Sequence, residues 1–212
     1  MTGGASGIGR AIVELLEREG REVTVLDARD GFDVGEPAAW ESVGAVELAF
    51  LNAGVDTGVA EVTAVSDDAY RRILRANLDG VVFGVRRLAA VMAPGGAIVV
   101  TASLAGLVAM ERDPLYTLTK HGVIGYVRSV AAQLSERGIR ISAIAPGFTD
   151  TPLLGDESRE AVAASGVPLL SAESVAAAAL RAAREAEPGA VWVVQPGRDP
   201  VPFRFPNVPG PR

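Results

Sequence analysis

The chain has 212 residues and a mass of 21.9 kDa, which suits one domain with a substantial hydrophobic core. Its net charge of −6 argues against a nucleic-acid or anionic-membrane surface, because either would need a basic stripe. There is no cysteine and only one histidine, His121, so disulfides, thiolate nucleophiles and cysteine or multi-histidine metal sites are excluded.

No apolar run reaches the roughly 18 residues of a membrane-spanning helix, and no signal-peptide pattern opens the chain. We therefore expect a cytoplasmic protein with no metal, no nucleic-acid partner and no membrane segment. Acid–base chemistry near neutral pH has to come from carboxylates, tyrosine or lysine whose pKa values the fold has shifted.

Helix and strand patterns alternate along the chain. In the first predicted helix Ile8, Ile12 and Leu16 fall on one stripe, and Gly20 ends it. Ser66 is the predicted N-cap of a second helix, or kinked pair of helices, that runs to about Met92. The other predicted helices cover 36–43, 114–137 and 171–186, and the predicted strands cover 21–27, 46–54, 97–103, 139–147 and 190–195.

Buried strands that alternate with helices predict an α/β fold, a Rossmann-like, doubly wound parallel sheet in three layers. We expect a single domain over 1–212, with the proline-rich residues 196–212 as an extended C-terminal arm. Ligands of such sheets bind beyond the carboxyl ends of the strands, so the residues at those ends are the candidates for a site.

The first candidate is the loop MTGGASGIG at residues 1–9. Gly3, Gly7 and Gly9 let the backbone turn sharply and approach a ligand, and the loop runs into a helix N-terminus, which suits a pyrophosphate. The spacing G-x-x-x-G-x-G differs from the fingerprint G-x-G-x-x-G, and a plain turn remains the alternative.

Asp27 follows the next predicted strand. Its carboxylate could accept hydrogen bonds from an adenosine ribose and would repel a 2′-phosphate, which favours NAD over NADP. Arg29 opposes this interpretation weakly, because it could pair with a phosphate, and a turn-forming role for Asp27 stays open. The small turn Asn52-Ala53-Gly54 would let a strand end lie against adenine or ribose.

Ser103 ends a buried strand, and Tyr116 and Lys120 follow on the next helix. Their i, i+4 spacing puts the phenol and the ammonium on one face, where the cation would stabilise a phenolate and lower the pKa of the tyrosine. Such a pair alone is more often found on a solvated helix. Together with Ser103 and the glycine loop, it favours an acid–base site.

These elements together resemble the short-chain dehydrogenase/reductase family. The matching segments occur in family order over nearly the whole chain: TGGASGIG, Asp27, NAG at 52–54, Asn77 in RANLDG, Ser103, YTLTK at 116–120 and PGFTDT at 146–151. The resemblance implies an oxidoreductase that transfers a hydride between NAD(H) and a secondary alcohol or ketone.

The resemblance also implies roles for individual residues. Tyr116 would donate or accept the proton, Lys120 would lower its pKa and bond the nicotinamide ribose, and Ser103 would hold the substrate oxygen. Asn77 would anchor a water of a proton relay, with a helix-kink role as the alternative. The cofactor would be bound by Gly3, Ser6, Gly7, Ile8, Gly9, Asp27, Asp33, Val34, Asn52, Ala53, Gly54, Tyr116, Lys120, Pro146, Gly147 and Thr151.

The chain departs from the family pattern in several places. Only Met1 and Thr2 stand where the first strand is expected, which suggests the hypothesis that Met1 is an initiator inside a longer reading frame. A helix, and part or all of a strand, are missing between Asp27 and Asp33, so the adenine pocket would be open on one side. Leu51 stands where the family usually has the first asparagine of Asn-Asn-Ala-Gly, and the sequence after the last predicted strand differs from the C-terminal sequence common in the family.

Two functional hypotheses follow. The first is an NAD-dependent enzyme for an uncharged, moderately apolar secondary alcohol or ketone, with its specificity in 104–115 and 152–170. The second is a truncated, catalytically impaired relative that acts as a binding or interaction protein. The resemblance further implies a homodimer or homotetramer formed through the helices at 66–92 and 115–137.

Overall fold

The computed structural model describes residues 1–206 and confirms the predicted fold class. Within these residues one sheet has the strand order β1-β2-β3-β4-β5, formed by Leu48–Leu51, Ala97–Thr101, Arg140–Pro146, Val191–Val194 and Val201–Pro202. β1 to β4 are parallel to one another, and β5 is antiparallel to β4. Parallel neighbours need a crossover between them, which the alternating helices supply.

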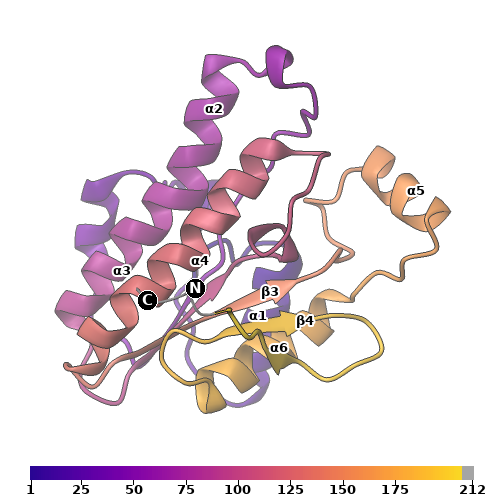
Figure 1. Cartoon of the computed structure of the whole chain (residues 1–212). Coiled ribbons are helices and arrows are strands. Elements are labelled where there is room, and N and C mark those ends of the chain that lie inside the picture. The colour runs from indigo at the N-terminus through magenta and orange to yellow at the C-terminus, as the bar shows by residue number, and fades with distance from the viewer. Residues whose placement is uncertain (207–212) are drawn as a thin grey trace, which may run out of the picture.

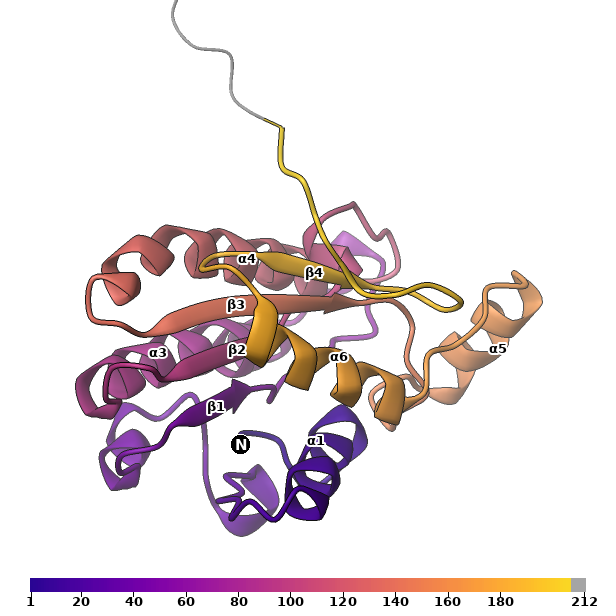
Figure 2. The same cartoon turned by 90° about the horizontal axis from the view of Figure 1, so that it is seen from below.

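Helices cover both faces of the sheet, so the molecule has three layers (Figures 1 and 2). Successive strand residues point to opposite faces. In β2, Ile98 and Val100 pack under α3 and α4, whereas Val99 packs with α1 and α6 on the other face. The helices span Gly7–Arg18 (α1), Asp67–Leu74 (α2), Gly80–Val91 (α3), Pro114–Ser135 (α4), Asp156–Ala164 (α5) and Ala172–Glu185 (α6).

The helix ends follow the capping residues of the sequence. The Ser66 and Ser171 hydroxyls accept hydrogen bonds from the third backbone N–H after each, and they start α2 and α6. The predicted kinked pair is α2 and α3, joined by the π-helical turn Arg75–Asp79. α5 was not predicted, although its acidic first turn is a weak signal, and it stands apart from the sheet at the end to which the strands point (Figure 1).

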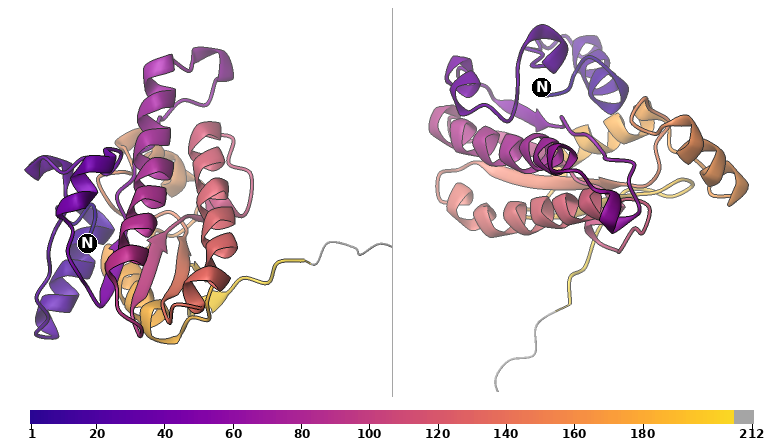
Figure 3. Two further views of the ribbon diagram at one scale, coloured as in Figure 1. Left: turned by 90° about the vertical axis from the view of Figure 1, so that its left-hand side faces the viewer. Right: turned by 90° about the horizontal axis from the view of Figure 1, so that it is seen from above.

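The predicted strand over 21–27 is wrong. Only Leu26 forms a bridge, to Thr2, and Thr2 also bridges Leu51 of β1. The Thr2 N–H donates to the Phe50 carbonyl at 3.0 Å, and the Leu26 N–H donates to the Met1 carbonyl at 2.8 Å. The N-terminus lies beyond β1, on the side away from β2 (Figures 2 and 3). Among the described residues only Met1–Gly3 pairs with this segment, through Leu26, so the rest of 21–27 has no strand partner.

The arm predicted over 196–212 is not extended throughout its described part. Val201–Pro202 turns back as β5, and the Phe203 N–H donates to the Val191 carbonyl at 2.7 Å. The Arg128 guanidinium lies 3.7 Å from the centre of the Phe205 ring, which fixes the arm on α4. Apolar residues thus cover the edge of β4. Residues 207–212 of the predicted arm lie outside the described residues.

None of the helices in the described part of the chain is long and apolar enough to cross a membrane.

Thr2 joins the start of the chain to the end of β1. Its side chain is 3% exposed, and its hydroxyl oxygen accepts hydrogen bonds from the Asn52 and Ala53 N–H groups at 2.9 and 3.1 Å. Thr2 therefore lies between Leu26 and the end of β1 and bridges both.

The substitution Thr2→Val keeps the shape of this side chain and removes the acceptor. We expect the free energy of unfolding to fall by about 1–3 kcal/mol, because two N–H groups lose their partner. Urea denaturation at an unchanged m value measures this loss. Thr24→Val, at an exposed site, is the control and should have little effect. Equal stability of the Thr2→Val protein and the parent would contradict the role of the hydroxyl.

Candidate active site

A cavity of about 820 Å³ opens at the carboxyl ends of β1, β2 and β3. Its walls come from the glycine loop, from the residues that follow these strands, and from the start of α4. Of the site residues predicted from the sequence, all except Gly9 and Asn77 line this cavity, and those two support its wall from behind. The parallel sheet therefore brings the predicted set together, as its topology requires.

The glycine loop needs its three spaced glycines. A Cβ on Gly9 would overlap the Gly3 carbonyl oxygen, and one on Gly3, where φ is +63°, would lie 2.9 Å from the Ala53 Cα. Gly7, at φ +51°, lies against Thr151. The Ser6 side chain forms no capping hydrogen bond, so the first N–H groups of α1 keep their capacity for a ligand. An uncapped helix N-terminus that borders a cavity offers free N–H donors to a pyrophosphate bound there.

Thr2 is a site residue that the sequence analysis missed. Its hydroxyl fixes Asn52 and Ala53 at the end of β1, and the Asn52 side-chain amide donates to the Gly3 carbonyl at 3.3 Å. The glycine loop is thus held to the turn at 52–54 from both sides. A hydroxyl residue directly before the first glycine is the signal that would have found it.

Asp27 combines the two roles that the sequence left open. Its carboxylate accepts hydrogen bonds from the Ala5 and Arg29 N–H groups, both at 3.0 Å, so it shapes the turn and braces the glycine loop. It also lines the cavity. The Arg29 guanidinium donates to the Ala5 carbonyl at 3.3 Å, and Arg29 is not among the cavity-lining residues.

Asp33 and Val34 form the next part of the wall. Burial acts to raise the pKa of Asp33, but hydrogen bonds from Arg75 and the Gly35 N–H outweigh it and hold the pKa below its ordinary value. The Trp40 indole donates to the Val34 carbonyl at 2.8 Å. Between Asp27 and Asp33 the chain forms one short 3-10 turn, Ala28–Asp30.

Tyr116 and Lys120 lie one helical turn apart on α4 and face the cavity, with Ser103 beside the phenol. The Lys120 ammonium lies 5.3 Å from the centre of the Tyr116 ring and donates to the Thr101 carbonyl at 2.9 Å. Lys120 is 4% exposed, and burial lowers its pKa from 10.5 to about 8. The favourable environment for this cation is therefore a carbonyl and an aromatic ring rather than a carboxylate.

The expected lowering of the Tyr116 pKa is not found in the protein alone. Burial raises this pKa from 10.0 to about 12, the Ser103 hydroxyl acts against the rise, and the charges of Asp56 and Asp113 add to it. Desolvation of the phenolate is the largest cause of the rise, and the two carboxylates add to it. At neutral pH Tyr116 is thus a protonated phenol.

Asn77 fixes the loop that follows β1. Its amide donates to the Val55 carbonyl at 2.9 Å and to the Thr119 hydroxyl at 3.0 Å, and its oxygen accepts from the Val55 N–H at 2.8 Å. Both amide hydrogens are therefore used, and the side chain could only accept from a relay water. Its place in the π-helical turn lets it reach another segment, rather than its own backbone as the alternative supposed.

Asp113 is a second residue that the sequence analysis missed. It is the N-cap of α4, with one oxygen accepting from the Tyr116 N–H at 2.9 Å. Its other oxygen accepts from the Thr57 and Gly58 N–H groups at 2.6 and 3.0 Å. An aspartate before a proline at a helix start is the signal for such a cap.

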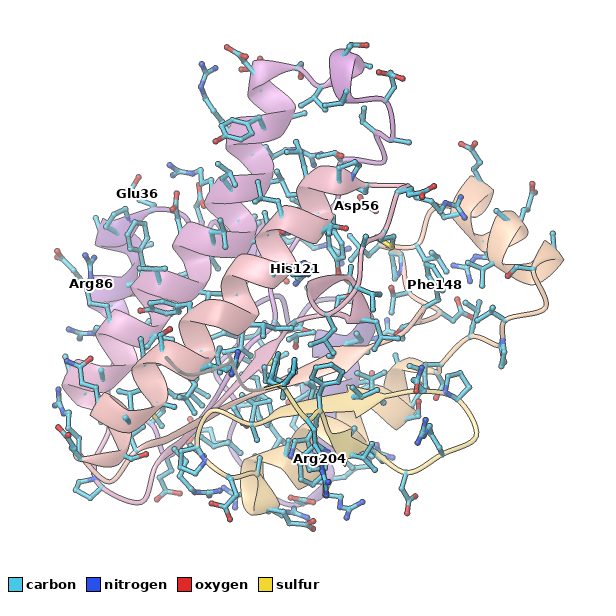
Figure 4. All side chains as sticks on the ribbon, in the orientation of Figure 1. Glu36, Asp56, Arg86, His121, Phe148 and Arg204 are labelled. Atoms are coloured by element: carbon cyan, nitrogen blue, oxygen red, sulfur yellow. The ribbon has the colours of Figure 1, made fainter. Side chains whose placement is uncertain are left out.

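His121, the one histidine of the chain, is exposed on α4 and is not among the residues that line the cavity (Figure 4). Its Nδ1 lies 3.0 Å from the Thr117 carbonyl oxygen. The acid–base groups beside Ser103 are therefore the phenol of Tyr116 and the carboxylates near it.

Comparison with known proteins agrees with this geometry. A family model described as an enoyl-(acyl carrier protein) reductase matches residues 34–189, which is more than half of the chain. The cyclohexanol dehydrogenase of Acinetobacter sp. (strain SE19) is 32% identical over 186 residues, which cover 74% of each chain. The chain belongs to the short-chain dehydrogenase/reductase family. It is an oxidoreductase that acts on alcohol and ketone groups.

Solved structures of short-chain dehydrogenases/reductases share the fold. A small-chain dehydrogenase in complex with NADPH has a TM-score of 0.79 at 23% identity, covering 92% of this chain and 94% of its own. The 3-ketoacyl-(acyl-carrier-protein) reductase of Brucella melitensis, complexed with NADH, has a TM-score of 0.78 at 22% identity, covering 93% of this chain and 96% of its own. Both comparisons show that the chain shares the fold of these enzymes.

Lys120 is the only lysine of the chain, so its pKa can be measured without assignment. In protein labelled with ¹³C-lysine, we expect the Cε signal to titrate at about 8 in the folded state, because burial disfavours the ammonium. The buried ammonium therefore costs stability below pH 8, and this cost disappears as the pH rises from 8 to 10.5. The urea-unfolded protein is the control. Titration near 10.5 in the folded protein would contradict the burial of the charge.

Proposed function

We propose that this protein is an NAD-dependent dehydrogenase or reductase of secondary alcohols and ketones in which Tyr116 is the acid–base catalyst. One observation carries the proposal. The phenol of Tyr116, with Ser103 and Lys120 beside it, lies in the same cavity as the open N-terminus of α1. A proton-transfer group and a dinucleotide cradle on one cavity are the two requirements of hydride transfer to a carbonyl.

The nicotinamide cofactor, when bound, would supply or accept the hydride. The glycine loop and the first N–H groups of α1 would hold its pyrophosphate, and Lys120 would bond its nicotinamide ribose. Pro146, Gly147 and Thr151 would cover the nicotinamide and pyrophosphate from the opposite wall. A side chain at Gly9 or Gly3 would displace the glycine loop. The glycines therefore keep the loop in the position from which its backbone could approach the pyrophosphate.

NAD is the proposed cofactor rather than NADP. The Asp27 carboxylate lines the cavity and would repel a 2′-phosphate, while each of its oxygens keeps a lone pair for a ribose hydroxyl. The opposing residue, Arg29, donates to the Ala5 carbonyl and lies outside the cavity-lining set. The charge that faces the adenosine ribose is therefore negative.

The roles of the other residues follow from their contacts. Ser103 would orient the substrate oxygen toward the Tyr116 phenol. Asn77 and Thr119 are positioning residues, because the Thr119 hydroxyl donates to the Tyr116 carbonyl at 2.8 Å and accepts from the Asn77 amide. With a pKa of about 12, Tyr116 is ready to donate a proton at neutral pH, whereas alcohol oxidation needs the phenolate and accelerates as the pH rises.

The proposed substrate is an alicyclic secondary alcohol or the corresponding ketone, as the similarity to a cyclohexanol dehydrogenase suggests. Apolar residues of 104–110 and 148–154 line the substrate end of the cavity. We also propose a cytoplasmic homodimer or homotetramer, for which Tyr70 and Leu118 offer exposed apolar surface on α2 and α4. No observation favours the alternative of an impaired binding or interaction protein.

Tyr116→Phe tests the mechanism. We expect kcat/KM for cyclohexanol oxidation and cyclohexanone reduction to fall by about 10³-fold, because the proton donor is removed, with NADH affinity little changed. Steady-state kinetics and NADH titration measure the two effects. Tyr126→Phe, on the same helix and outside the cavity lining, is the matched control. Turnover by the Tyr116→Phe enzyme at the parent rate would refute the assigned role.

A further inference from the structure

Asp56 is a cavity-lining acid that the reaction does not use. It follows the turn at the end of β1, and it lines the same cavity as Asp113 and Tyr116. Figure 4 shows Asp56 and Phe148 between the start of α4 and α5, and both residues line the cavity. Asp56 therefore faces the part of the cavity that receives the substrate.

The backbone around Asp56 is fixed on both sides. Before it, Val55 exchanges two hydrogen bonds with the Asn77 amide. After it, the Thr57 and Gly58 N–H groups donate to Asp113. The Asp56 carbonyl itself accepts from the Arg72 guanidinium at 2.9 Å. These bonds fix the backbone position of a residue that lines the cavity, as a specific ligand contact requires.

The Asp56 carboxylate nevertheless has no side-chain partner within the described residues. Asp113 is fully occupied by three N–H groups, but no other side chain within residues 1–206 makes an ion pair or hydrogen bond with the carboxylate of Asp56. Burial, followed by the charge of Asp113, raises its pKa, and its own N–H and the more distant Arg72 act against the rise. This acceptor is thus available to a molecule in the cavity.

Apolar side chains form much of the wall of the cavity that Asp56 borders, among them Val108, Met110, Phe148 and Leu153. Arg112 and Glu157 also line it, but both are exposed to solvent. In an apolar wall, one fixed carboxylate strongly favours a ligand that offers a hydrogen-bond donor, and it disfavours an anion.

We propose that Asp56 is a specificity-determining residue that accepts a hydrogen bond from a second donor group, a hydroxyl or an ammonium, on an alicyclic alcohol substrate. The preferred substrates are then diols, hydroxyketones or amino alcohols, and a carboxylate at the same place is rejected. This inference rests on the proposed function for the position of the substrate beside Tyr116.

The test compares ring compounds of similar size and different charge. Cyclohexanol, the isomeric cyclohexanediols, aminocyclohexanols and hydroxycyclohexanecarboxylates are each assayed for binding by calorimetry to the NAD⁺-loaded protein and for turnover. We expect at least one diol or amino alcohol to exceed cyclohexanol in affinity and in kcat/KM by about 10-fold or more, and the carboxylates to fall below it. The hydroxyl and ammonium series show which donor is preferred.

Variants assign the effect to one side chain. In Asp56→Ala the ratio of kcat/KM for the preferred diol or amino alcohol to kcat/KM for cyclohexanol, both measured on the same variant, should fall to about 1. Asp56→Asn should relieve the rejection of carboxylates. Glu41→Gln, which removes an exposed acid outside the cavity lining, should leave the preferences unchanged.

The inference is overturned if the parent protein shows no preference for a second donor, or if Asp56→Ala keeps that preference. It is also overturned if Asp56→Ala lowers the affinity and kcat/KM of every substrate by the same factor, as the loss of a purely structural residue would. If ligands with a second donor bind more tightly and this needs Asp56, but no compound is turned over, the proposed function is contradicted and this inference is supported. If the compounds are turned over without a preference for a second donor, this inference is contradicted and the proposed function is supported.

Discussion

The hydrogen bonds of Met1–Gly3 are the constraint on which the rest of the site depends. This short segment pairs with Leu26 on one side and with Phe50 and Asn52 on the other, and the Thr2 hydroxyl closes the gap at the end of β1. The glycine loop then starts at a fixed point relative to the sheet, and α1 directs its uncapped N-terminus into the cavity. The backbone groups of this segment and the Thr2 hydroxyl form the hydrogen bonds that hold the glycine loop to the sheet.

From the end of β1, one connected network reaches the catalytic helix. Val55 is bonded to Asn77, Asn77 to Thr119, and Thr119 to the Tyr116 carbonyl. A second route runs from Thr57 through Asp113 to the Tyr116 N–H. The phenol is therefore positioned by two routes that begin at the same loop. Burial keeps Tyr116 protonated and lowers the pKa of Lys120, so the site's electrostatics are set by desolvation as much as by charge pairs.

The sequence predicted the elements whose signals are local. The stripe of α1, the serine caps of α2 and α6 and the buried strands β1 to β4 needed no knowledge of distant contacts. The segment 21–27 has the composition of a strand, but a strand also needs a neighbour, and only tertiary structure shows that the neighbour is short. The clamping role of Thr2 and the loop-fixing role of Asp113 depend on bonds between residues about 50 positions apart, which spacing along the chain does not reveal. The raised pKa of Tyr116 comes first from burial, and the charges of Asp56 and Asp113 add to it, although neither carboxylate was a candidate.

Titration of the protein with NADH tests most directly whether the short N-terminal segment still forms a cofactor cradle. Trp40 donates to the Val34 carbonyl, and Val34 lines the cavity, so energy transfer from tryptophan to bound NADH reports occupancy. We expect saturable transfer at micromolar NADH, with weaker binding of NADPH because of the Asp27 carboxylate. The absence of a saturable signal up to millimolar NADH would contradict the cradle.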